Sequence, residues 1–201
     1  MKTSINGVIL AGGLSSRFSC KDKAHLKIRE KKILDYIYDV FKDLFNQITI
    51  VTSNPLHCIE WNCNIAADIF PVKSSLTGIH TGLFFSSTSH TFFSACDLPF
   101  LKKEVVETII ERVNPSDDVI IPETSTGIEP LCAVYSSRCL KPVADNIVRR
   151  KFKIQSFFNQ VRVKRINEEV LRKKDSELLS FFNINTPEDL VRAEEILAGI
   201  N

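Results

Sequence analysis

The chain has 201 residues, 44% of them hydrophobic, which is enough apolar material to fill one core in a domain of ordinary size. We therefore expect a single domain over residues 1–201. The 26 lysines and arginines are balanced by 24 acidic residues, and the formal charge of +2 excludes the strong basic field of a dedicated nucleic-acid or membrane-surface binder. Neither nucleic acid nor a membrane is an expected partner.

The six cysteines occur singly along the chain, without a C-x-x-C pair. Because the first residues show no secretion signal and no stretch approaches the length of a membrane span, we expect a cytoplasmic protein with reduced thiols. His57, Cys58 and Cys63 lack the fourth ligand and the spacing of a zinc site, so a structural role is favoured for them.

In chain order, the first predicted elements are a buried strand and a helix that packs over it. Residues 5–10 form a short apolar run that leads into Ala11-Gly12-Gly13, which predicts a strand entering a turn. Apolar residues from 33 to 45 recur at spacings of three and four, as on one face of an amphipathic helix. A second strand is predicted at 48–52.

The alternation of strands and helices continues to the end of the chain. Further strands are predicted at 65–67, 91–95, 119–121 and 161–163, and helices at 79–85, 104–113 and 187–197. Residues 138–158 show weaker helical spacing and a basic run at 149–153. The last helix has Thr186 at its expected N-cap and Pro187 at its first position. This order predicts an α/β fold with a three-layer, mostly parallel, Rossmann-like sheet.

The turn after the first strand is the first candidate site. Ligands of open α/β sheets bind beyond the carboxyl ends of the strands, and Gly12 and Gly13 would let backbone amides approach a phosphate. Arg17 and Lys23 add two cations that a structural turn does not need. Neither the G-x-G-x-x-G nor the G-x-x-x-x-G-K-[ST] pattern is present, which disfavours a nicotinamide-dependent oxidoreductase or a P-loop enzyme.

Two carboxylates follow predicted strands and are the second candidate site. Asp97 ends an apolar strand just before Pro99, at the same sheet edge as the glycine turn, where a single carboxylate beside phosphate oxygens suits Mg²⁺. Its alternative role is to cap the following helix. Asp68 ends the run at 65–67 and could accept hydrogen bonds from a base or ribose, serve as a second metal ligand, or be a solvated loop acid.

Taken together, these motifs resemble those of the molybdenum cofactor guanylyltransferases of the MobA type, in the nucleotidyltransferase superfamily. Four segments carry the resemblance, in the family's order. They are 10–13 with Ser16-Arg17 and Asp22-Lys23, then 95–100, then Glu129-Pro130-Leu131, and finally 183–189.

The resemblance implies a sheet of the nucleotidyltransferase type and the Mg²⁺-dependent transfer of GMP from GTP to molybdopterin, with release of pyrophosphate. It implies that Lys23, Arg17 and Asp97 are catalytic and that Asp97 is the metal ligand. The implied binding residues are Leu10, Ala11, Gly12, Gly13, Lys23, Asn54, Asp68, Gly78, Asp97, Asn183 and Asn185.

Within that set, Asn183 and Asn185 would lie on the pterin side, or else serve the turn and cap before the last helix. Besides GTP and molybdopterin, molybdoenzyme-maturation proteins are candidate partners, and a monomer or weak oligomer is expected.

The chain departs from the family pattern in two loops. Ser19 stands where members commonly have glycine, and Ser74-Ser75 stand in place of Gly-Pro, which bears on loop shape and base selection. Cytidylyl transfer to the same pterin, or nucleotidyl transfer to another cofactor or sugar phosphate, is the nearest alternative. Gly12 favours GTP, because the resembling cytidylyltransferases tend to have alanine there. A non-catalytic nucleotide sensor would be expected to lack Asp97 or Lys23.

Overall fold

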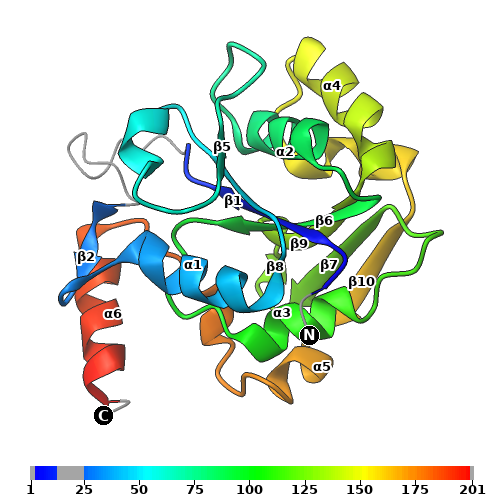
Figure 1. Cartoon of the computed structure of the whole chain (residues 1–201). Coiled ribbons are helices and arrows are strands. Elements are labelled where there is room, and N and C mark those ends of the chain that lie inside the picture. Colours follow the sequence, from blue (N-terminus) through cyan, green and yellow to red (C-terminus); the bar gives the residue numbers. More distant parts are fainter. Residues whose placement is uncertain (1–2, 13–24, 200–201) are drawn as a thin grey trace.

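The computed structural model describes residues 3–12 and 25–199. At its centre lies a sheet in the order β10-β7-β9-β6-β1-β4-β5, with β8 paired to β7 (Figure 1). The strands are β1 (Asn6–Leu10), β4 (Ile48–Val51), β5 (Asn64–Ala66), β6 (His90–Ala95), β7 (Val119–Thr124), β8 (Gly127–Ile128), β9 (Cys132–Ser136) and β10 (Val163–Asn167).

The pairing of these strands confirms the mostly parallel sheet. β1 pairs in parallel with β4 and β6, β4 with β5, and β7 with β10. β9 runs antiparallel to both β6 and β7, between which it is inserted. The carboxyl ends of β1, β4, β5, β6 and β7 therefore meet at one edge, and β9 begins at that edge.

Helices cover both faces of the sheet and give the predicted three layers. They are α1 (Ile33–Leu44), α2 (Ser75–Phe85), α3 (Lys103–Ile110), α4 (Leu140–Val148), α5 (Glu168–Arg172) and α6 (Pro187–Gly199). Figure 1 shows α1 and α3 on one side of the sheet and α2 and α4 on the other. Successive residues of β1 point to opposite faces of the sheet. Ile9 packs with α1 and α3, whereas Val8 and Leu10 pack with α2 and α4.

Helix α2 lies unusually close to the sheet. A Cβ at Gly82 would lie 2.5 Å from Cε1 of Phe93, and one at Gly78 would lie 3.1 Å from Cδ2 of Leu10. Glycine at these positions lets the first turns of α2 approach the end of β1. The helix begins four residues before the predicted start at 79, because the side chain of Ser74 caps it and accepts a hydrogen bond from the N–H of Thr77 at 3.1 Å.

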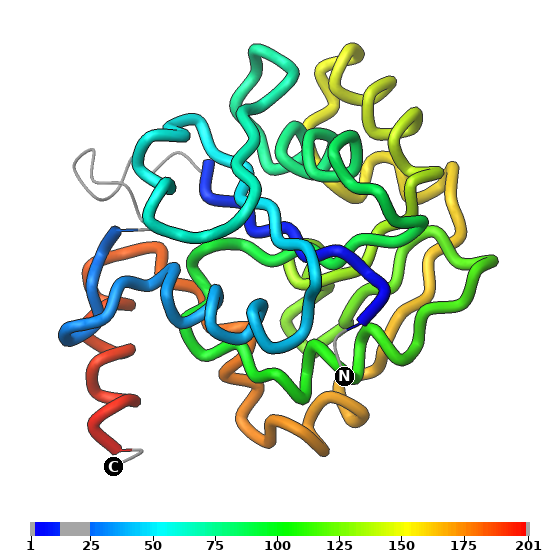
Figure 2. The backbone as a smooth tube through the Cα atoms, in the orientation of Figure 1, coloured from blue at the N-terminus to red at the C-terminus, as the bar shows by residue number. Residues whose placement is uncertain are grey.

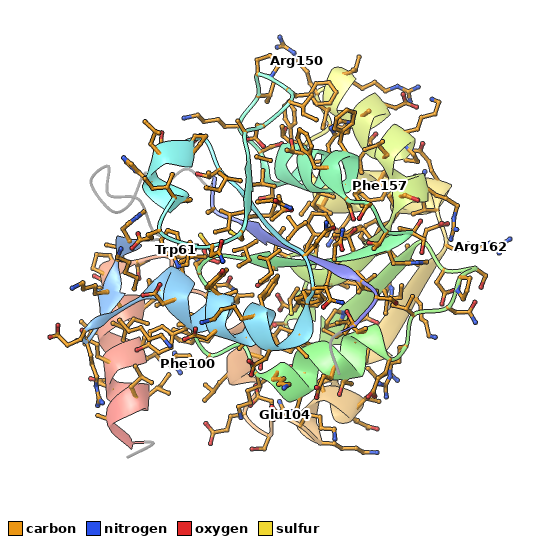
Figure 3. All side chains as sticks on the ribbon, in the orientation of Figure 1. Trp61, Phe100, Glu104, Arg150, Phe157 and Arg162 are labelled. Atoms are coloured by element: carbon orange, nitrogen blue, oxygen red, sulfur yellow. The ribbon has the colours of Figure 1, made fainter. Side chains whose placement is uncertain are left out.

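The weakly helical region 138–158 begins in a short 3₁₀ helix, Ser137–Cys139. It also contains α4 and, after it, most of a second 3₁₀ helix, Ile154–Gln160. Between them the backbone of Arg150 has a φ of 57°, which ends the regular helix. Figure 3 shows Arg150 at the outer surface. The strand predicted at 161–163 begins only at Val163, as β10.

A third, smaller hydrophobic cluster joins the C-terminal helix to a hairpin that was not predicted. The hairpin consists of β2 (Lys27–Ile28) and β3 (Lys31–Lys32). Figure 2 shows α6 running beside this hairpin, and Ile28, Ile184 and Ala193 share a hydrophobic cluster. Segment 183–185, which precedes α6, is thereby packed against the segment that follows residue 24.

The N-terminus of α6 confirms the expected cap. Oγ1 of Thr186 accepts a hydrogen bond from the N–H of Asp189 at 3.2 Å, and Oδ2 of Asp189 accepts the N–H groups of Asn185 and Thr186, both at 2.9 Å. Among residues 3–12 and 25–199, no helix is both long and apolar enough to cross a membrane.

Candidate functional site

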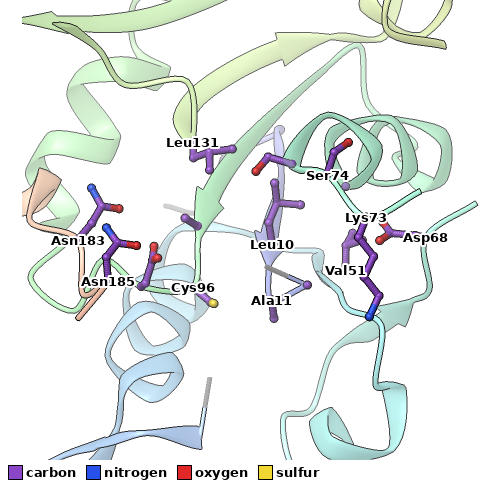
Figure 4. A pocket seen from close by; sticks show the side chains of 15 residues that line it. Leu10, Ala11, Val51, Asp68, Lys73, Ser74, Cys96, Leu131, Asn183 and Asn185 are labelled. Carbon is purple, nitrogen blue, oxygen red and sulfur yellow. The ribbon is translucent and has the colours of Figure 1, made fainter. Parts of the chain in front are cut away.

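A cavity of about 400 Å³ lies at the carboxyl edge of the sheet. The ends of β1, β4 and β6 form its floor, and the start of α2 and the segment before α6 form two of its sides (Figure 4). It contains most of the binding residues named from the sequence. These are Leu10, Ala11, Gly12, Asp68, Gly78, Asp97, Asn183 and Asn185.

The glycine turn enters the cavity from β1. The N–H of Ala11 still bonds to the carbonyl of Val51 at 2.8 Å, and the N–H of Cys96 bonds to the carbonyl of Leu10 at 3.1 Å, so both neighbouring strands hold the start of the turn. A Cβ at Gly12 would lie 3.9 Å from Oδ2 of Asp68. Gly12 is therefore adjacent to the carboxylate of Asp68.

The remaining residues of this loop lie outside the described part of the chain. They are Gly13, Arg17, Ser19 and Lys23. Gly12 and His25 are the last and first described residues on either side of them.

Asp97 follows β6 and lines the cavity, half-buried. Its backbone carbonyl accepts a hydrogen bond from the N–H of Ile184 at 3.0 Å, which ties it to the segment that carries Asn183 and Asn185. The alternative role of Asp97 as a helix cap is wrong, because the N-cap of α3 is Lys102, five residues later.

Asn183 and Asn185 line the cavity because they alternate with a core residue. Ile184 is fully buried in the cluster shared by the hairpin and α6, and in an extended segment the residues on either side of it point the opposite way. The cap of α6 is formed by the side chains of Thr186 and Asp189, to which Asn185 contributes its backbone N–H. The two amide side chains therefore do not cap this helix. The side chain of Asn183 does serve the turn before it, because its Nδ2 donates a hydrogen bond to the carbonyl of Phe181 at 3.0 Å.

Asp68 is a partly buried carboxylate on the opposite side of the cavity. Burial raises the pKa of Asp68 above its ordinary value, although a hydrogen bond with Thr81 and the charge of Lys73 both favour the ionised form. Within the described part of the chain, its buried Oδ1 has no hydrogen-bond partner. A buried acceptor of this kind is suited to a donor group on a ligand.

Sequence reasoning missed several lining residues. They are Val51, Lys73, Ser74, Ser75, Ala95, Cys96 and Leu131. Lys73 and Ser74 carried a usable signal, because a cation directly before a Ser-x-x-Thr helix cap lies at a helix N-terminus, where anionic ligands often bind. Leu131 directly precedes β9, a strand that was not predicted. It belongs to the Glu129-Pro130-Leu131 motif of the resemblance but was not named as a binding residue.

Asn54 does not line the cavity. After Thr52 the chain turns outward, the N–H of Asn54 bonds to Oγ1 of Thr52 at 3.1 Å, and its carbonyl accepts the N–H of His57 at 3.0 Å at the start of a 3₁₀ helix, Pro55–Cys58. The side chain of Asn54 is exposed. The implied contact between Asn54 and a ligand stays a prediction.

Residues 7–164 match the family model of the MobA-like NTP transferase domain, which covers the glycine turn, Asp68 and Asp97. The chain belongs to the MobA-like NTP transferase family. The resemblance inferred from the motifs and the α/β nucleotidyltransferase fold are thus confirmed.

The similarity of this MobA-like transferase to its relatives covers nearly its whole length. It is 41% identical, over 191 residues and 95% of each chain, to the molybdenum cofactor guanylyltransferase of Desulfosudis oleivorans. It is 34% identical, over 98% of each chain, to a probable molybdenum cofactor guanylyltransferase of Natranaerobius thermophilus. The crystal structure of molybdopterin-guanine dinucleotide biosynthesis protein A from Archaeoglobus fulgidus superposes with a TM-score of 0.86 at 29% identity, covering 97% of this chain and 100% of the other.

The donors in the cavity of this transferase fit a hard cation better than a soft one. In the described ranges, no group of three or more His, Cys, Asp or Glu side chains could hold a metal ion. Asp97 and the amide oxygens of Asn183 and Asn185 line the cavity. One carboxylate with neutral oxygens suits Mg²⁺, which takes its other ligands from phosphates and water.

Proposed function

We propose that this MobA-like transferase catalyses the Mg²⁺-dependent transfer of GMP from GTP to molybdopterin, which forms the guanine dinucleotide cofactor and pyrophosphate. The observation that carries the proposal is one cavity lined by the glycine turn, Asp97 and the segment 183–185. The names of the relatives with 41% and 34% identity support the choice of substrates.

In the proposed reaction, an oxygen of the terminal phosphate of molybdopterin attacks the α-phosphorus of GTP in line. A new P–O bond forms while the bond to the bridging oxygen of the β-phosphate breaks, and pyrophosphate leaves. Because the nucleophile is already an anion, no base has to remove a proton, and the protein contributes position and charge.

The chain's own residues would supply that position and charge from three sides. Backbone groups of Leu10, Ala11 and Gly12 would hold the nucleotide phosphates, and Lys23 and Arg17 would offset the charge that grows on pyrophosphate. Asp97 would hold Mg²⁺, which when bound neutralises charge on the phosphates. Asn183 and Asn185 would orient the acceptor from the opposite side.

The surroundings of Gly12 support GTP over CTP. Among the described residues other than its chain neighbours, the atom nearest to a Cβ at this position would be the backbone N of Ser53 at 3.8 Å, so these residues do not require glycine there. The glycine instead keeps open the space in front of Asp68, which a methyl group would narrow. A purine needs more of this space than a pyrimidine, which favours guanine over cytosine.

The decisive experiment is to incubate the protein with Mg²⁺, molybdopterin and each nucleoside triphosphate in turn. Pyrophosphate is measured, and the pterin product is identified by mass. We expect pyrophosphate and the guanine dinucleotide with GTP, and neither with an Asp97→Asn variant of native thermal stability. Product with CTP alone would overturn the choice of GTP, and no product with any nucleotide would overturn the proposed function.

A further inference from the structure

Two side chains of opposite charge lie together at one end of the cavity. In Figure 4, Asp68 and Lys73 lie on one side of the end of β1, marked by Leu10 and Ala11, whereas Asn183 and Asn185 lie on the other. Asp97 is joined to the asparagine side by the hydrogen bond from Ile184. The Asp68 end is therefore the end remote from the proposed metal and acceptor.

The backbone on both sides of this pair is held in place. The N–H of Ile69, next to Asp68, bonds to Oγ1 of Thr81 in α2 at 3.1 Å. Lys73 directly precedes Ser74, whose side chain caps α2. Oδ2 of Asp68 lies toward Gly12 and its Oδ1 is buried, while the side chain of Lys73 is exposed.

A carboxylate beside an ammonium forms a specific pattern of acceptors and a donor. Ionised aspartate accepts hydrogen bonds at both oxygens, and lysine only donates. Guanine offers the matching edge, because its N1–H and its 2-amino group donate side by side and O6, next to N1, accepts. Cytosine has one amino donor followed by two acceptors, and adenine has an unprotonated N1 that a carboxylate repels.

We infer that Lys73 is a specificity-determining residue, whose ammonium donates to O6 of the guanine while Asp68 accepts from N1–H and the 2-amino group. This inference rests on the proposed function and deepens it, since it assigns the choice of base to two named side chains. A phosphate role for Lys73 is the competing possibility, which the test below separates from base recognition.

The size of the effect follows from the kind of bond. A hydrogen bond from a charged donor changes binding affinity by about tenfold or somewhat more. Because the side chain of Lys73 is exposed and water screens its charge, we expect a change of about tenfold. Loss of the ammonium should therefore weaken GTP binding about tenfold. It should not weaken the binding of a purine nucleotide that lacks O6.

The test measures nucleotide binding by calorimetry, with Mg²⁺ and without acceptor. The ligands are GTP, ITP, which lacks the 2-amino group, 2-aminopurine riboside triphosphate, which lacks both O6 and the N1–H, and CTP. The effect of each variant is measured against the wild type with the same nucleotide. The proteins are the wild type, Lys73→Met, Lys73→Arg and, as a matched control outside the cavity, Lys173→Met. Circular dichroism and thermal melting establish that each variant is folded.

We expect Lys73→Met to bind GTP and ITP about tenfold more weakly and the O6-lacking nucleotide as the wild type does. Lys73→Arg should restore most of the loss, and Lys173→Met should show none. Equal weakening of all four nucleotides would assign Lys73 to the phosphates and overturn the inference, as would unchanged binding of GTP.

The outcomes also distinguish this inference from the proposed function. Because binding is measured without molybdopterin, a failure of guanylyl transfer would leave the predicted pattern of affinities intact. If the wild type transfers GMP but Lys73→Met keeps the wild-type preference for nucleotides that carry O6, the inference about Lys73 is overturned and the proposed function stands. Tighter binding of CTP than of GTP by the wild type would contradict both.

Discussion

Gly12 is the single residue at which the proposed choice of nucleotide can be tested most directly. Gly12→Ala should leave the fold intact, because the new methyl group would lie 3.8 Å or more from every described residue other than its chain neighbours. It should lower kcat/KM for GTP relative to CTP by about tenfold or more, since it narrows the space in front of Asp68. Steady-state kinetics with both nucleotides measure the ratio. An unchanged ratio would mean that the base does not approach Gly12.

Lys23 tests the electrostatic part of the mechanism. If it offsets charge on the leaving pyrophosphate, Lys23→Ala should lower turnover by about 10²–10³, the usual loss for one preorganised donor. Single-turnover formation of pyrophosphate at saturating GTP is the measurement. Lys27→Ala, which removes an exposed lysine of β2, is the control. Wild-type turnover in Lys23→Ala would remove this residue from the mechanism.

At the scale of elements, the start of α2 explains one departure from the family pattern. Ser74 replaces a common glycine, and its hydroxyl bonds to both the N–H of Thr77, at 3.1 Å, and the Thr77 hydroxyl, at 2.9 Å. The serine therefore forms a helix cap in the loop that lines the cavity.

The cap predicts a specific order of stabilities. Ser74→Ala should lower the free energy of unfolding by about 1 kcal/mol, whereas Ser74→Gly should cost only a few tenths of that, because glycine is tolerated at N-caps. Urea unfolding at pH 7 measures both. The control is Ser176→Ala, because Ser176 is exposed. Ser86, at the other end of α2, is unsuitable as a control because it accepts a hydrogen bond from Thr91. Equal losses in the two Ser74 variants would show that the cap is not what stabilises this turn.

The segment before α6 links the acceptor side of the site to the third hydrophobic cluster. Ile184 is fully buried between two asparagines that line the cavity. Ile184→Val should cost about 0.5–1.5 kcal/mol and Ile184→Ala about 2–5 kcal/mol of stability. Because the cluster holds Asn183 and Asn185 in place, KM for the acceptor should rise more than KM for GTP. Urea unfolding measures the loss of stability, and steady-state kinetics measure the two KM values. A rise in KM for GTP alone would contradict the placement of the acceptor beside Asn183 and Asn185.

At the scale of the whole molecule, a buried carboxylate that does not line the cavity makes stability depend on pH in acid. The side chain of Asp175 is fully buried, where it accepts bonds from Nζ of Lys102 at 2.8 Å and from the N–H of Ser180 at 2.7 Å. Burial alone would raise its pKa, but these bonds outweigh it and hold the pKa of Asp175 below its ordinary value of 3.8. The ionised form is thus favoured by folding.

The sign of the pH dependence follows. A lowered pKa contributes stability that is fully present above the unfolded value of about 3.9 and is lost as the pH falls through the lower folded value. Asp175→Asn should be less stable by about 1–3 kcal/mol at pH 7 and should lose less stability between pH 5 and 3 than the wild type. Urea unfolding across this range is the measurement, with the exposed pair member Asp145→Asn as control. If the free energies of unfolding of the wild type and Asp175→Asn fall in parallel between pH 5 and 3, Asp175 is not the source of this pH dependence.

The sequence by itself determined what each segment buries. The apolar run of β1, the helical spacing of α1 and the Thr186 cap of α6 are local patterns, and the structure confirms all three. Because parallel strands end at one edge, the order of elements also predicted that the turn at Gly12 and the carboxylate of Asp97 would meet. That the chain forms one domain over residues 1–201 stays a prediction.

Only the tertiary structure decided which other side chains complete the cavity. β9 is inserted antiparallel between β6 and β7 and brings Leu131 to the cavity, Lys73 reaches it from the loop before α2, and Asn54 does not line it. The reason is physical. The spacing of apolar residues shows which side of a segment packs against the core. The lining of a cavity depends instead on contacts between segments far apart in the chain, and no local pattern encodes those contacts.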